Sequence, residues 1–296
     1  MGGMCLAQNA DSSAASREDL SSITGTHEPP MLGIHWARGF NPFARAHQAK
    51  GTNPDMTYHG GVIMPSTVSK AIFWGPKWAN SSFTADKITG LDSWYSGFNG
   101  SNYAKTSDEY TGSNGQVGSS LTNDHYLVDT STAANGSSTS AIVAEVCKEI
   151  TSPVTNGYYP VYVDVPRGNA GYCAYHTFGT CGGKTVQVAF FFDLDGDAGC
   201  DPGDTSGLHS QGLAALANVS GHELSEARTD PDSPGAWYDR RGQENGDKCA
   251  WTFNVPLVSF TNGTQWKIQG EWSNNAYNSG TGYPNNTGQK GCLDGH

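Results

Sequence analysis

From about residue 56 onward, apolar residues recur along the chain at the spacings typical of strands and helices. Residues 68–74 (VSKAIFW), 161–165 and 186–192 (VQVAFFF) have the short, β-branched and aromatic composition of strands. The run 186–192 is apolar at almost every position, which is typical of a strand buried on both faces. We therefore predict a sheet with residues 186–192 near its centre.

Other segments have the periodicity of helices. A helix capped by Thr84 would place Ile88, Leu91 and Tyr95 on one face, and residues 138–150 show a similar spacing. The strongest pattern is the apolar stripe of residues 210–228, which Pro231 should end. The stripe consists of Leu213, Leu216, Ala217, Leu224 and Ala227.

The order of these elements predicts the fold class. Near the C-terminus, residues 258–260 and 264–272 flank Asn262-Gly263, the signature of a tight hairpin turn. Strands alternate with helices before the long helix, and a hairpin follows it. This order predicts a single α+β (mixed α/β) domain over residues 56–296, with a central mixed sheet, the long helix and a C-terminal β-hairpin.

The first 55 residues differ from the rest. The opening MGGMCLAQ resembles the end of a secretory signal, and residues 8–55 are rich in Ser, Ala, Asn and Pro with few periodic apolar positions. We expect residues 1–55 to be a signal remnant and a disordered leader or pro-segment.

Charge and composition narrow the function classes. The net charge is −11, and an acidic surface repels phosphate backbones, so we expect no nucleic-acid partner. The chain has no apolar stretch of the length that spans a membrane. Only 15% of residues are charged and 38 are glycine, a composition that favours a secreted, extracellular protein. We expect the protein to be a monomer.

The cysteines support an oxidising compartment. Cys5 stands alone near the start, and the other six form an even set that suits three disulfide bonds. Six cysteines allow 15 pairings, of which the short loop Cys173–Cys181 is favoured here. The alternative is a set of buried free thiols in a cytosolic protein.

Candidate chemistry lies on the long helix. His222 and Glu226 are four residues apart, so an imidazole and a carboxylate on one helix face could hold one metal ion. Glu223 follows His222 as the general base does in HExxH zinc peptidases, with Glu226 in place of the second histidine. Zinc accepts carboxylate oxygen. The alternative is an ordinary charged helix face, but small apolar residues around His222 favour burial, where such groups need a cation.

A catalytic zinc needs a third protein ligand. Glu244 lies 22 residues after His222, and Asp247 follows in the same segment as a second ligand or as an acid that orients His222. Asp230 is the remaining alternative. The sequence leaves these three candidates open.

A second acidic cluster resembles a calcium loop. Its residues are Asp193, Asp195, Asp197, Asp201 and Asp204. The glycine of the EF-hand pattern is displaced by one residue, so the alternative is a turn rich in Asp and Gly. We expect structural roles for His59, His176 and His209, and a core position for Tyr238.

The run SGHELSEARTDP, with AWYD and ENGDKCAW, resembles bacterial secreted HExxE metallopeptidases. Together with Tyr58-His59-Gly-Gly, residues 71–75 and 157–160, the CAYH segment at Cys173 and the C-terminal hairpin, it is distantly similar to the plant exordium / phosphate-induced protein 1 family. The resemblance covers roughly residues 56–296. It implies secretion and cell-wall association, although the plant proteins generally lack the pair corresponding to His222 and Glu223, so the scaffold does not itself imply peptidase activity.

Two functional hypotheses follow. The first is a secreted zinc-dependent hydrolase of the metallopeptidase type that acts on a peptide or protein, with Glu223 as general base. The second is a non-enzymatic, exordium-type protein associated with a cell wall or surface. Metal content separates the two.

Overall fold

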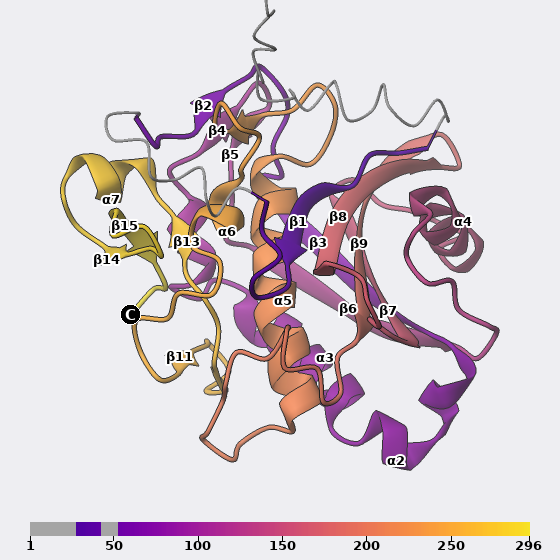
Figure 1. The fold of residues 1–296 in the computed structure, drawn as a ribbon. Helices are drawn as coiled ribbons and strands as arrows, with labels where there is room; N and C mark the ends of the chain where they lie inside the picture. The colour runs from indigo at the N-terminus through magenta and orange to yellow at the C-terminus, as the bar shows by residue number, and fades with distance from the viewer. Residues whose placement is uncertain (1–27, 43–52) are drawn as a thin grey trace, which may run out of the picture.

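One six-stranded mixed sheet forms the centre of the molecule, with helices on both faces (Figure 1). The computed structural model describes residues 28–42 and 53–296. The strand order is β1-β8-β9-β7-β3-β6; β9, β7, β3 and β6 run parallel, and β8 is antiparallel to both of its neighbours. The strands are β1 Leu32–Trp36, β3 Thr67–Trp74, β6 Leu121–Asp129, β7 Gly157–Pro166, β8 Tyr172–Cys181 and β9 Lys184–Asp193.

The strands predicted from the sequence are confirmed as β3, β7 and β9. β9 lies inside the sheet between β8 and β7, and residues 186–192 are buried throughout. The prediction of a single α+β domain with a central mixed sheet is confirmed as well. Residues of the sheet and of the helices packed on it together make up the main hydrophobic core.

Two of the main helices cover one face of the sheet and a third covers the other. The hydroxyl of Tyr162 on β7 bonds to Tyr95 on α3 at 2.8 Å and to Ser220 on α5 at 2.7 Å. Tyr175 on β8 instead bonds to the Gly136 carbonyl at 3.0 Å, just before α4. Because side chains alternate along a strand, His176 points toward the α5 side. The helices are α2 Ser81–Thr84, α3 Lys87–Phe98, α4 Thr139–Glu149, α5 Gln211–Thr229, α6 Asn245–Lys248 and α7 Asn274–Asn278, with 3-10 turns η2 Pro76–Ala79 and η3 Ala104–Ser107.

Serine residues cap two of the main helices, whereas the cap predicted at Thr84 is wrong. Ser138 and Ser210 accept the third backbone N–H of α4 and α5, as N-cap serines do. Thr84 does not cap α3: it ends α2, and its hydroxyl donates to the Trp78 carbonyl at 2.9 Å. α3 therefore begins three residues later, at Lys87.

Short strands complete the fold. The predicted hairpin is present as β11 Val258–Ser259 and β12 Gln265–Trp266, but it is shorter than expected. The chain leaves it after Trp266 because the Gln269 N–H bonds to Asn218 of α5 at 2.8 Å. The remaining strands are β2 Thr57–Tyr58 with β10 Trp237–Tyr238, β4 Thr111–Gly112 with β5 Gly115–Gln116, and β13 Glu271–Trp272 with β15 Lys290–Leu293 and β14 Tyr283–Pro284.

The predicted boundary at residue 56 is wrong, because β1 belongs to the main sheet. β1 pairs antiparallel with β8, and Leu32 and His35 are buried. Its pairing contains two register irregularities, and it carries a buried histidine and a glycine, so the strand has no clean apolar alternation. The expectations for Cys5 and the signal remnant lie outside the described residues.

Three disulfide bonds are present, as the cysteine count predicts, but the favoured pairing is wrong. Cys147 pairs with Cys181, Cys173 with Cys200, and Cys249 with Cys292. Cys173 and Cys181 lie at the two ends of β8 and are therefore too far apart to bond. Within the described ranges, none of the helices has the length and apolar character of a membrane crossing.

Candidate metal centre

Helix α5 carries the first half of the candidate site. It runs through the middle of the molecule (Figure 1), and every residue from Gly212 to Thr229 is buried. Its buried polar side chains include His222, Glu223 and Glu226, each with 0% exposure. Burial of such groups is costly unless partners compensate them. The presence of three buried ionisable side chains on one helix therefore indicates a function.

Helix α6 carries the second half of the candidate site. The Asp247 carboxylate accepts the backbone N–H of Glu244 at 3.2 Å, which fixes the first turn of α6. The Asp247 N–H donates to Glu226 Oε1 at 2.9 Å and docks this turn onto α5. Two of the three acidic candidates for the third ligand, Glu244 and Asp247, are therefore held against the helix that carries His222.

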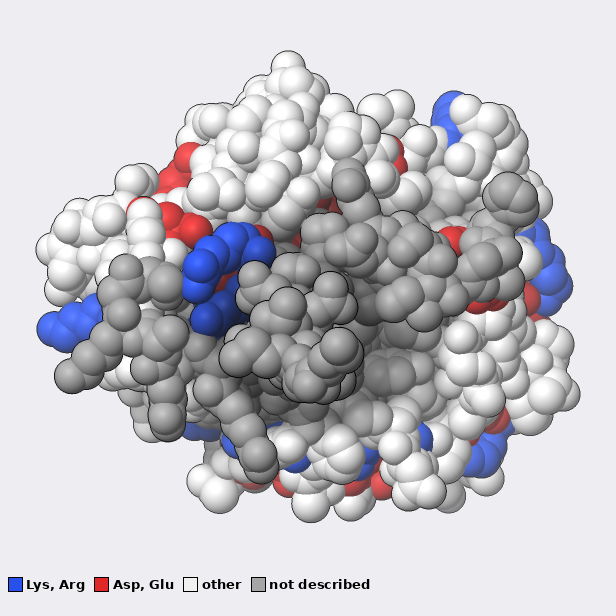
Figure 2. All heavy atoms as spheres, turned by 45° about the horizontal axis from the view of Figure 1, so that its top comes forward, with Lys and Arg blue, Asp and Glu red and all other residues white. Residues whose placement is uncertain are grey.

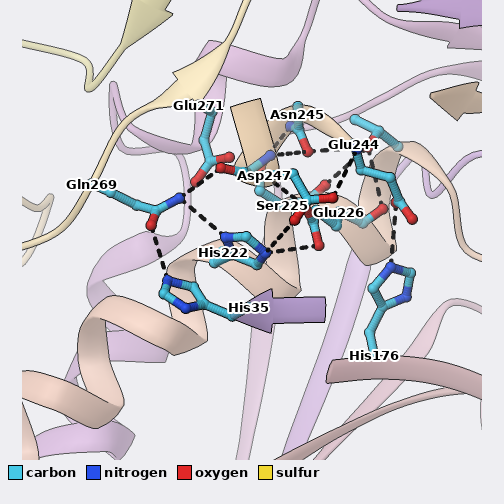
Figure 3. Close-up of polar contacts among 12 residues, drawn as sticks. His35, His176, His222, Ser225, Glu226, Glu244, Asn245, Asp247, Gln269 and Glu271 are labelled. Atoms are coloured by element: carbon cyan, nitrogen blue, oxygen red, sulfur yellow. Dashed lines mark hydrogen bonds and ion pairs between the residues drawn. The ribbon is translucent and has the colours of Figure 1, made fainter. Parts of the chain in front are cut away.

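The side chains form two groups that share Glu226 (Figure 3). One group is His222, Glu226 and Asp247, and the other is His176, Glu226 and Glu244. In each group the ligand atoms lie within 4.8 Å of one another, the spacing that a single cation could bridge. His222 Nε2 lies 3.8 Å from Asp247 Oδ1, and His176 Nε2 lies 3.3 Å from Glu244 Oε2.

The contact between His222 and Glu226 indicates a place for a cation. Nε2 and Oε2 are 3.1 Å apart, yet their geometry makes no hydrogen bond, and neither atom has another hydrogen-bond partner. Two orphaned, fully buried ligand atoms that face each other are uncommon in proteins. A metal ion between them would satisfy both.

The ring of His222 is held from its other side by Gln269. The Gln269 amide nitrogen lies 3.1 Å from His222 Nδ1 and 2.9 Å from the Gly246 carbonyl (Figure 3). Because the Gln269 nitrogen donates to the Gly246 carbonyl, the same amide group donates to His222 Nδ1, which leaves the ring proton on Nε2, facing Glu226. A metal ion at Nε2 would take the place of this proton. Partners of this kind orient metal-binding histidines.

Burial controls the protonation of the cluster. It raises the pKa of Glu223 and Glu226 well above the usual carboxylate range, and the charges of Asp247 and Glu244 raise both further. Burial also lowers the pKa of His222, and the neighbouring His35 and His176 lower it further. A divalent cation would reverse the effect on the carboxylates, because it favours their charged forms.

Two histidines near the centre were not predicted to be part of it. His176, expected to be structural, lies in the second group. His35 packs edge-on against His222 with ring centroids 4.3 Å apart, and its Nε2 lies 3.0 Å from the Gln269 oxygen. Neither histidine lies in a local sequence motif that would indicate metal binding. His35 lies in the segment predicted as leader, and only the β1–β8 pairing brings both histidines to α5.

Asp230 and the other expected residues lie elsewhere. Asp230 ends α5, and its carboxylate accepts the Ala236 N–H at 2.6 Å, so it is in neither ligand group. His59 stacks on Tyr238, which lies in the short strand β10 rather than in the core, and His209 stacks on Trp266. The structural roles predicted for His59 and His209 agree with these contacts.

The predicted calcium loop does not gather its carboxylates. Asp195 pairs with Lys87 at 2.5 Å, and Asp197 pairs with Arg167 at 2.6 Å, so basic side chains of the chain itself neutralise them. Asp201 and Asp204 accept backbone N–H groups two residues ahead, as in ordinary turns rich in Asp and Gly. Among the described residues, no group with metal-ligand spacing includes Asp193, Asp195, Asp197, Asp201 or Asp204.

A third carboxylate cluster is already neutralised by a lysine side chain. Asp129, Glu145 and Glu149 meet the same spacing criterion, but the Lys148 ammonium lies 2.5–3.2 Å from all three. On the face shown in Figure 2, charged residues form small separate groups. The acidic cluster at α5 is thus distinguished by burial, since Glu223, Glu226 and Glu244 have 0% exposure.

Space for a ligand adjoins the centre on the Asp247 side. A cavity of about 180 Å³ is lined by Ala37, Gly39, Asp247 and Trp251, among others. A larger hollow of about 600 Å³ lies near the C-terminus, lined by Lys105, Tyr283 and His296, and contains no residue of the cluster. Of these two cavities, the smaller one reaches a residue of the cluster, Asp247.

Comparison of the chain with protein-family models, curated proteins and solved structures finds no match. The class that the fold and the site define is an α+β protein with a buried His-Glu-Asp cluster able to hold a metal ion. Function must therefore be inferred from the chemistry of this cluster.

Proposed function

We propose that this chain is a secreted, zinc-dependent hydrolase of the metallopeptidase type, with zinc held by His222, Glu226 and Asp247. The observation that carries the proposal is the orphaned contact between His222 Nε2 and Glu226 Oε2 at 3.1 Å, with Asp247 beside it. One imidazole and two carboxylates form a donor set that zinc accepts, and three protein ligands leave a position for water or substrate.

Zinc in this position would supply a Lewis acid that polarises a carbonyl group and lowers the pKa of a water molecule. The chain's own contribution to proton transfer would come from Glu223. Its carboxylate is fully buried, neither oxygen has a well-formed hydrogen bond, and the charges of Asp247 and Glu244 act on it. A base in this position can take a proton from water and deliver it to a leaving amine.

Access to the centre would come from the cavity beside Asp247. β1 covers the rest of the site, and its Gly33 lies directly against Glu226 and His176. An extended polypeptide is a natural substrate class, because β1 is itself a chain segment that pairs with β8 over this helix. Productive binding would require β1 to shift from its present position.

Three disulfide bonds are compatible with an oxidising, extracellular compartment, which supports the secreted part of the proposal. The similarity to exordium-type and HExxE proteins remains a prediction from the motifs.

The test is the pair of variants Glu223→Gln and Glu149→Gln, each loaded with zinc and assayed on a quenched fluorescent peptide library. Glu149 is the matched control because it lies on α4, on the other face of the sheet. We expect Glu223→Gln to lose at least 100-fold in hydrolysis while zinc content stays normal, and the control to match the wild type. Loss of zinc together with activity would make Glu223 structural and contradict the assigned role.

The exordium-type alternative makes the opposite prediction. A wild-type protein that takes up no stoichiometric zinc and cleaves no peptide would favour a non-enzymatic role at a cell wall or surface. Zinc uptake without peptide cleavage would shift the substrate class toward other bonds, such as cell-wall amides.

A further inference from the structure

We propose a second metal position beside the first, formed by His176, Glu226 and Glu244, so that Glu226 bridges two divalent cations. The proposal rests on the proposed function only in that it shares Glu226 with the first position. It assigns a ligand role to His176, for which the local sequence indicates none.

The first support is the position of His176. It lies in the middle of β8 with 0% exposure, and its ring points toward Glu244 (Figure 3). Its Nε2 lies 3.3 Å from Glu244 Oε2, and both atoms lie within 4.8 Å of a Glu226 oxygen. The geometry therefore repeats the histidine and two carboxylates of the first group around a common residue.

The second support is the backbone of β1, which lies directly against these ligand atoms. A Cβ atom on Gly33 would lie 2.0 Å from Glu226 Oε2 and 2.6 Å from His176 Nε2. Only glycine at this position avoids a clash with both ligand atoms, so no side chain of β1 comes between them. Its φ of +42° is also a conformation that other residues rarely adopt.

The third support is charge. The cluster holds four carboxylates, from Glu223, Glu226, Glu244 and Asp247, and the first three are completely buried. The neighbouring Lys248 is engaged with Asp239 at 3.2 Å. One divalent cation would offset two of these four negative charges, and a second would offset the other two; Glu271, also fully buried, accepts a hydrogen bond from Tyr103 instead. Uncompensated buried charge is costly, so the second ion would stabilise the cluster further.

A pair of ions that share a carboxylate is the arrangement of two-metal hydrolases, in which the ions are about 3.5–4 Å apart. Glu226 could bridge because its Oε2 faces both His222 and Gly33, while Oε1 accepts the Asp247 N–H. Both positions would be lost together if this carboxylate were changed.

The experiment measures metal stoichiometry on the full chain. Apo protein is titrated with Zn²⁺ and bound metal is counted after gel filtration, for the wild type, His176→Ala, Glu244→Gln and Glu226→Gln. His59→Ala is the matched control, because it removes an exposed histidine that stacks on Tyr238 outside the cluster. Far-UV circular dichroism and denaturant unfolding check that each variant is folded.

We expect two equivalents in the wild type and the control, one in His176→Ala and Glu244→Gln, and none in Glu226→Gln. With Co²⁺ as probe, the wild type should show the magnetic coupling of a bridged pair in its electron paramagnetic resonance spectrum, and His176→Ala should not. A wild type that binds one equivalent, with His176→Ala unchanged, would overturn the second position and leave the proposed function standing. A wild type that binds none would overturn both.

Discussion

Gly33→Ala is the most informative single substitution, because it tests whether β1 lies against the cluster. The new methyl group would lie 2.0 Å from Glu226 Oε2 and 2.5 Å from His176 Cδ2, far inside van der Waals contact. Both neighbours are fully buried and can move little. Overpacking of this kind costs about 1–3 kcal/mol.

The backbone adds a second cost. Gly33 has φ +42°, and a non-glycine residue there costs about 1 kcal/mol. The total expected loss in the free energy of unfolding is therefore about 2–4 kcal/mol. Gly39→Ala is the matched control, since Gly39 has φ +81° but nothing lies within 4 Å of its Cβ position. The control should lose only the backbone part, about 1 kcal/mol.

Urea unfolding at equilibrium, followed by tryptophan fluorescence in chelator, measures both variants without a contribution from metal. The difference between them isolates the contact of β1 with Glu226 and His176. If Gly33→Ala is no more destabilising than Gly39→Ala, β1 does not lie on the cluster, and the description of the covered site is wrong.

Two further substitutions test the neighbourhood of the α5 cluster and, separately, the carboxylate group on α4. Gln269→Ala removes the amide that orients His222 and also holds His35, so zinc affinity should fall about 10–100-fold in a competition titration with a chromophoric chelator; unchanged affinity would deny Gln269 a positioning role. Burial and the Asp129 carboxylate raise the pKa of Glu145 to about 7, above its value in an unfolded chain. Stability from this group is thus fully present at low pH and is lost as pH rises through about 7. Glu145→Gln should flatten this part of the stability–pH profile, and an identical decline in wild type and variant would contradict the assignment.

Much of the scaffold could be predicted from local patterns. The runs that became β3, β7 and β9 have strand composition, and α4 and α5 begin at serine caps visible in the sequence. β1 and β8 could not be predicted in this way. β1 has a glycine and a buried histidine in an irregular register, and β8 mixes Cys, His, Thr and Gly without clear alternation. Their pairing depends on long-range contacts, which no short window of sequence contains.

The candidate site also consists of residues that local sequence patterns predict and residues that only long-range contacts bring together. His222, Glu223 and Glu226 were found because helical spacing is a local rule, and Glu244 and Asp247 because they follow in one short segment. The sequence offered these last two as alternatives for one position, whereas the structure places each in its own ligand group. His176, His35 and Gln269 come from separate elements, so only the folded chain brings them together.

The central claim, that the α5 cluster holds metal, is tested most directly by the zinc content of the folded protein. Wild type and His222→Ala are dialysed against excess Zn²⁺ and then against buffer, and bound zinc is measured by inductively coupled plasma mass spectrometry alongside thermal unfolding. The account predicts stoichiometric zinc in the wild type, a markedly lower content in His222→Ala, and a zinc-dependent rise in melting temperature that is larger in the wild type than in His222→Ala. A folded wild type without stoichiometric zinc, or a His222→Ala variant that binds zinc as the wild type does, would contradict it.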